Sequence, residues 1–110
     1  MLPKRERLSR KDFSHFFSVG RRVHTTWCML VVAPCNTLHV SVVVPKKVVQ
    51  GAVARNKLRR RIYDIVRRYR HEKTLTGVYI IVVKQLAIPM EYSTLQEAVQ
   101  KILANPKLIT

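Results

Sequence analysis

The chain has 110 residues, which suits one domain with a modest hydrophobic core. Apolar residues make up 47% of it, which excludes a disordered basic tail. Lysine and arginine number 21 against 6 acidic residues, and the formal net charge of +15 indicates a polyanionic partner: nucleic acid first, an anionic membrane surface second.

The first predicted element is a short helix after a basic leader at residues 1–8. Ser9 fits an N-cap, and Asp12 favours the positive end of a helix. Three phenylalanines follow at helical spacing: Phe13, Phe16 and Phe17. Gly20 ends the helix. We assign Phe16 to the core and expect at least one of the others to be able to stack on unpaired bases.

Two strands are predicted next. Residues 23–33 are rich in Val and Thr and predict a strand that is broken near residues 25–26. A turn at 34–36 separates it from a second strand at 38–44. Pro45 then starts a basic loop that runs to Gly51.

The segment 53–70 predicts an amphipathic helix with an unusual polar face. Its apolar residues form one stripe: Leu58, Ile62, Ile65, Val66 and Tyr69. Eight lysines and arginines lie from Arg55 to Arg70, where Asp64 is the one acid, and Tyr63 is expected on the flank of the stripe. Because solvated helix faces usually mix both signs of charge, this pattern predicts a rigid row of cations for a sugar–phosphate backbone.

The last predicted elements are a strand and a helix. Gly77 opens a strand at 78–84, and a loop is expected at 88–89. Thr94 and Glu97 resemble a capping box for a final amphipathic helix. Asn105-Pro106 ends this helix, and residues 105–110 form a C-terminal tail.

The order of these elements predicts an α+β sandwich in which helices pack on a small sheet. The strand–helix–strand unit from Leu38 to Lys84 predicts a crossover between parallel strands. With no internal repeat or long linker, residues 1–110 are expected to form a single domain. The absence of an apolar signal core or a membrane-spanning run, and the presence of only two cysteines, predict a cytoplasmic protein.

No metal-binding or catalytic side chains are predicted. A zinc site is suggested superficially by His24, Cys28, Cys35 and His39. However, four residues of extended strand span roughly 13 Å, too far for His24 and Cys28 to share one ion. The six acidic residues are scattered over separate elements, and no nucleophile or phosphate-loop motif is present.

The basic helix and the loop before it carry a family resemblance. Lys46 and Lys47, a short loop and the run AVARNKLRR at 52–60 resemble the motif of the bacterial ribonuclease P protein subunit. Further matches extend the resemblance over nearly the whole chain: Arg5 and Leu8 through Asp12-Phe13, Gly20, and the late strand at 79–84. The chain departs from the family pattern at four places: Lys57 for arginine, Tyr63 for a basic residue, Val31 for an aromatic, and a loop at 48–54 that is one residue longer.

The resemblance implies a function in removing the 5′ leader from precursor tRNA. The family binds the catalytic RNA of ribonuclease P, and RNA and Mg²⁺ supply the chemistry; Mg²⁺ is held mainly by the RNA and the substrate. The implied RNA-binding residues are Lys46, Lys47, Arg55, Asn56, Lys57, Arg59, Arg60 and Arg67. Phe13 and Phe17 are implied to line a cleft for the single-stranded leader.

The resemblance also implies a left-handed crossover, as in the second domain of a small-subunit ribosomal protein, and a protein that binds its RNA one to one and is monomeric alone. Two other functions fit a basic helix. One is a structural ribosomal or ribosome-assembly protein. The other is a membrane-surface binder, although the predicted strands need the apolar stripe of this helix for the core.

Overall fold

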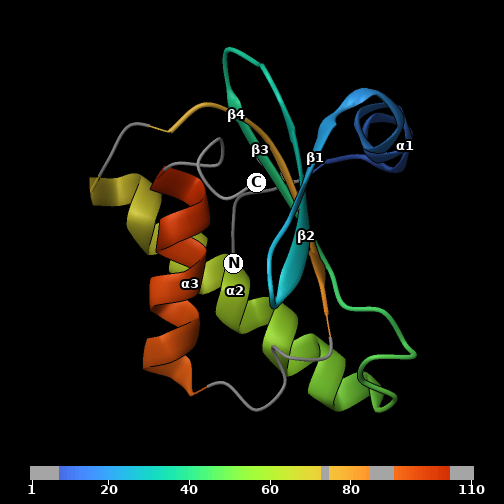
Figure 1. The fold of residues 1–110 in the computed structure, drawn as a ribbon, viewed down its shortest axis with the longest axis vertical. Helices are drawn as coiled ribbons and strands as arrows, with labels where there is room; N and C mark the ends of the chain where they lie inside the picture. Colours follow the sequence, from blue (N-terminus) through green and yellow to red (C-terminus); the bar gives the residue numbers. More distant parts are fainter. Residues whose placement is uncertain (1–7, 73–74, 85–90, 105–110) are drawn as a thin grey trace.

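The structure is a computed structural model and describes residues 8–72, 75–84 and 91–104 (Figure 1). Within these ranges the elements follow in the order α1 (Arg10–Val19), β1 (Arg21–His24), β2 (Cys28–Ala33), β3 (Leu38–Val43), α2 (Ala52–Glu72), β4 (Gly77–Val83) and α3 (Tyr92–Ala104). The predicted α+β order is confirmed. The predicted loop at 88–89 and the predicted helix end at 105–106 lie outside the described residues.

The four strands form one sheet in the order β1-β2-β4-β3. β1 pairs with β2 and β2 with β4 in antiparallel fashion, whereas β3 and β4 are parallel. Because α2 joins this parallel pair, the predicted crossover is confirmed. The predicted break at 25–26 is confirmed as the turn of a hairpin, where the Thr25 hydroxyl accepts a 3.0 Å hydrogen bond from the Cys28 N–H.

The helices cover both faces of the sheet, with α1 on one side and α2 and α3 on the other (Figure 1). The larger core lies between the sheet and the α2–α3 layer, and its strand residues include Leu30, Val40 and Ile81. A smaller cluster lies under α1 and contains Val31, Ala33, Val78 and Ile80. β4 is buried on both faces, which explains why its sequence is a continuous apolar run instead of an alternating one.

The apolar stripe of α2 faces the larger core as predicted. Leu58 is half-buried and the other four stripe residues are buried. The prediction that Tyr63 lies on the flank is wrong, because its side chain is only 6% exposed. Its hydroxyl oxygen accepts a 3.0 Å hydrogen bond from the Val42 N–H of the edge strand β3. A tyrosine can be buried here because its ring is apolar and its polar tip has a partner.

α1 begins and ends where the sequence predicts. The Ser9 hydroxyl accepts a hydrogen bond from the Asp12 N–H, and the Gly20 N–H donates to the Phe16 carbonyl. Gly20 has an extended backbone (φ −68°, ψ 156°), which any residue can adopt. A glycine is needed here because there is no room for a side chain, and not because the backbone is left-handed. A Cβ at this position would lie 2.4 Å from Val31 Cγ1.

The predicted capping box of α3 is wrong. The helix starts at Tyr92, and the Leu95 N–H already bonds to the Glu91 carbonyl, so Thr94 and Glu97 lie inside the helix. The earlier start lets the Tyr92 ring pack against the larger core. Tertiary packing therefore overrides a local capping motif. None of the helices in the described residues is long and apolar enough to cross a membrane.

Candidate nucleic-acid interface

The basic residues predicted from the sequence gather on α2 and the loop before it. Since the apolar stripe of α2 is committed to the core, its cations lie on the remaining surface of the helix. Lys46 and Lys47 are exposed in the turn that follows β3, where the Val48 and Val49 N–H groups donate to the Pro45 carbonyl at 3.0 and 3.1 Å. The exposed predicted residues of α2 itself are Asn56, Lys57 and Arg60.

Arg55 makes contacts within the protein that the sequence did not reveal. Its Nη1 donates hydrogen bonds to the Val49 and Gln50 carbonyls at 2.9 and 2.6 Å. Its side chain is half-buried. One terminal nitrogen of this guanidinium therefore holds the basic loop against the first turn of α2.

Arg59 is also held within the helix. It is half-buried, and its Nη2 donates a hydrogen bond to the Asn56 side-chain oxygen one turn earlier. This contact limits the rotamers of a long side chain, so Asn56 and Arg59 present a fixed pair of polar groups on α2.

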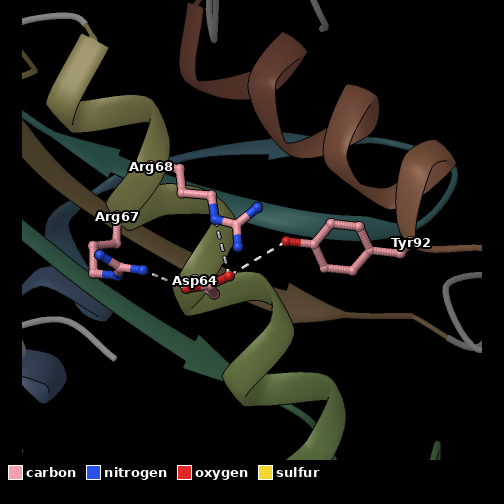
Figure 2. A network of polar contacts seen from close by, with 4 residues as sticks. All are labelled: Asp64, Arg67, Arg68 and Tyr92. Carbon is pink, nitrogen blue, oxygen red and sulfur yellow. Dashed lines mark hydrogen bonds and ion pairs between the residues drawn. The ribbon is translucent and has the colours of Figure 1, made fainter.

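Asp64 lies at the centre of a polar network that joins α2 to α3 (Figure 2). Its Oδ1 accepts a 2.8 Å hydrogen bond from Arg67 Nη2, and its Oδ2 lies 3.2 Å from Arg68 Nε. The Tyr92 hydroxyl donates to Oδ2 at 3.4 Å. The hydrogen bond from Arg67 is the main cause that lowers the pKa of Asp64, with a further contribution from the charge of Arg68.

Phe13 and Phe17 lie with α1, on the opposite side of the sheet from α2 (Figure 1). Their rings are stacked, with centroids 5.5 Å apart and planes at 18°. The guanidinium carbon of Arg22 lies 4.5 Å from the centroid of the Phe17 ring, and Arg22 Nη2 donates to the Phe17 carbonyl at 3.0 Å. Phe13, Phe16 and Phe17 are all half-buried and all pack against the smaller cluster, so the prediction that sets Phe16 apart as the core residue is wrong.

Comparison with known proteins identifies the family. A family profile for ribonuclease P matches residues 2–107. The chain is 30% identical to the ribonuclease P protein component of a Pseudanabaena species, over 99% of this chain and 97% of that protein. The chain belongs to the ribonuclease P protein family. It has the function of this family's protein component in tRNA 5′-end processing, and neither the profile nor the relative supports the alternative of a ribosomal protein.

Solved structures of the ribonuclease P family share the fold. The protein from Thermotoga maritima superposes with a TM-score of 0.78 at 22% identity, over 89% of this chain and 94% of that one. The protein from Staphylococcus aureus gives a TM-score of 0.74 at 20% identity, over 96% and 98% of the two chains. The arrangement of α2 and α1 on opposite faces of the sheet therefore belongs to an architecture found among ribonuclease P proteins.

Several residues of this family member were not among the predicted site residues. Arg61 and Arg68 are exposed on α2, and the charge run already contained the signal for them. No sequence pattern indicated Arg22, because its contacts with Phe17 depend on how β1 packs beside α1. Lys84, the basic residue that directly follows β4, donates from Nζ to the Thr25 carbonyl at 2.9 Å and so fixes the β1–β2 turn.

The two cysteines lie outside α2, and their pKa values shift in opposite directions. Burial raises the pKa of the Cys28 thiol to about 11, whereas hydrogen bonds from Thr37 lower the pKa of Cys35. Across the described ranges, no three His, Cys, Asp or Glu side chains are grouped as a metal site would require.

Proposed function

We propose that α2 and the loop at 45–51 bind the catalytic RNA of ribonuclease P. The observation that carries this proposal is the division of α2 into a buried apolar stripe and a basic surface, with Asp64 as the one acid between Arg55 and Arg70. A rigid helix presents guanidinium groups to phosphates without having to order its backbone on binding. Arginine also offers two parallel hydrogen bonds to one phosphate group.

The opposite face of the sheet is proposed to contact the 5′ leader of precursor tRNA. There the stacked rings of Phe13 and Phe17 lie beside the Arg22 guanidinium, an arrangement of aromatic and cationic groups that suits unpaired bases and their phosphates. Val31, which replaces an aromatic residue of the family, is fully buried under α1 and so offers no stacking surface. Phe13 and Phe17, with Arg22, are therefore the proposed leader contacts.

The endonucleolytic chemistry is proposed to belong to the RNA, with Mg²⁺ held mainly by the RNA and the substrate. The environment of Asp64, the one acid among the arginines of α2, supports this view. Both of its carboxylate oxygens contact arginine or tyrosine groups, so they are not available to bind Mg²⁺. The protein is proposed to act in the cytoplasm, monomeric alone and bound one to one with the RNA.

The test mixes the protein with bacterial catalytic RNA and precursor tRNA at low magnesium concentration and measures leader removal. We expect the wild-type protein to increase the cleavage rate, and the double variant Arg59→Gln/Arg60→Gln to need a higher protein concentration for the same rate. No stimulation at any concentration of the folded wild-type protein would contradict the proposed function.

A second comparison separates the two faces. Phe17→Ala should weaken the binding of precursor tRNA that carries a leader more than that of mature tRNA, because only the leader reaches the α1 face. An equal loss for both RNAs, in a variant with wild-type thermal stability, would remove Phe17 from the leader contacts.

A further inference from the structure

The run of arginines on α2 carries two energetic costs, one in the free protein and one on RNA binding. Adjacent guanidinium groups repel one another, and long side chains on a solvated helix sample many rotamers, which must be ordered when RNA binds. Arg67 and Arg68 are adjacent in this run, with side chains 38% and 58% exposed. Without a partner, each would have to be ordered by the RNA itself.

Asp64 supplies that partner for both arginines. It precedes them by three and four residues, the spacings at which side chains meet on one helix face. Arg67 binds one carboxylate oxygen and Arg68 the other, so the two guanidinium groups are held at separate positions around one anion. Figure 2 shows Arg67 approaching the carboxylate from one side while Arg68 and Tyr92 approach from the other.

Tyr92 fixes the carboxylate itself. Its hydroxyl reaches Oδ2 from the first residue of α3, and its ring is half-buried against the larger core. The contact therefore limits the rotation of the Asp64 side chain from outside α2. The three partners use both oxygens, and no part of the arrangement depends on a bound ligand.

We propose that Asp64 is a positioning residue, which holds Arg67 and Arg68 in a fixed arrangement for the catalytic RNA and is itself held by Tyr92. This inference rests on the proposed function of α2 and adds to it a role for Asp64, the one acid among the arginines of that helix. By fixing the two arginines, Asp64 makes the protein prefer an RNA whose phosphates match their positions, whereas net charge alone attracts any polyanion.

The test compares the affinity for the catalytic RNA with the affinity for a generic RNA duplex of similar length at fixed salt. Asp64→Asn keeps the shape of the side chain and raises the net charge by one, so net charge alone predicts the same gain for both RNAs. A positioning role predicts that the ratio of the two affinities falls by about fivefold, the size expected when one or two long side chains must be ordered on binding.

The matched control is Glu97→Gln, which makes the same charge change at an exposed position of α3. It should leave the ratio unchanged. If Asp64→Asn also leaves the ratio unchanged, or raises it, the proposal is overturned.

A double-mutant cycle separates this inference from the proposed function. In an Arg67→Gln/Arg68→Gln background, Asp64→Asn should no longer change the ratio, and a persisting fall would overturn the positioning role. If the two glutamines themselves leave the affinity for catalytic RNA unchanged, this part of α2 does not bind the RNA and the proposed function fails at these residues. Should Asp64→Asn unfold, Tyr92→Phe keeps every charge and should lower the ratio by a smaller factor, of about twofold; no fall would overturn the proposal.

Discussion

Replacing Gly20 by alanine tests how closely α1 approaches the sheet. A Cβ here would lie 2.4 Å from Val31 Cγ1 and 2.7 Å from the Phe16 carbonyl oxygen. Neither neighbour moves easily, because Val31 is a fully buried, β-branched side chain and the carbonyl belongs to the helix backbone. The variant must therefore displace the end of α1 from β2.

The expected cost follows from two opposing effects. Overpacking of this kind costs about 1–3 kcal/mol. Since φ is −68°, alanine adopts the backbone conformation of Gly20 without strain, and the lower entropy of the unfolded chain returns about 0.4–1 kcal/mol. We expect a net loss of about 1–2 kcal/mol in the free energy of unfolding, which lowers the melting temperature of a domain of this size by about 4–8 °C.

The assay is thermal and urea-induced unfolding of Gly20→Ala beside Gly51→Ala. A Cβ at Gly51 meets nothing closer than Ala54 Cβ at 3.9 Å, so the control should change stability by no more than about 0.5 kcal/mol. Equal melting temperatures for Gly20→Ala and the wild type would refute the close approach of α1. Equal losses for both variants would show that the effect is not specific to this contact.

Three further predictions concern the basic helix α2 and the two cysteines. Arg59→Ala/Arg60→Ala should weaken the salt dependence of binding to catalytic RNA. The slope of log affinity against log salt concentration should become shallower by about one unit per lost phosphate contact. An unchanged slope in salt titrations would contradict the placement of these arginines. At neutral pH, alkylation followed by mass spectrometry should label Cys35 before Cys28. Cys28 is fully buried and its burial raises the pKa of the thiol, whereas hydrogen bonds lower the pKa of Cys35. Faster labelling of Cys28 would contradict this order. The lowered pKa of Asp64 means that its ionised form stabilises the fold above about pH 4 and that this contribution is lost as the pH falls through the folded-state pKa. Asp64→Asn should therefore cost about 0.5–1 kcal/mol at pH 7 in urea unfolding, and this cost should shrink as the pH is lowered. A cost that does not change with pH would point to packing instead.

The sequence contained most of the information for α2 and for the start of α1. The spacing of Leu58, Ile62 and Tyr69 specified the buried side of a helix, and Ser9 with Asp12 specified a helix start. Such patterns can be read from the chain because they depend on residues that are close in sequence and on which face is hidden from water.

The local patterns failed where a distant element supplies the partner. Tyr63 is buried because its hydroxyl finds the Val42 N–H of β3, and α3 begins at Tyr92 and not near Thr94 because the Tyr92 ring packs on the core. Neither outcome is encoded within one turn of helix.

The sequence by itself determined that one helix has an apolar side and a strongly cationic side, and the family motif indicated that the partner is RNA. Only the tertiary structure decided which groups of the protein several of the arginines contact. It placed Arg55 on the carbonyls of its own loop and Arg67 on Asp64, and it brought Arg22 over the ring of Phe17. The physical reason is that charge and periodicity are properties of a segment, whereas a hydrogen bond or a ring contact requires two groups to meet at 3–5 Å, and that distance is set by how helices, strands and loops pack together.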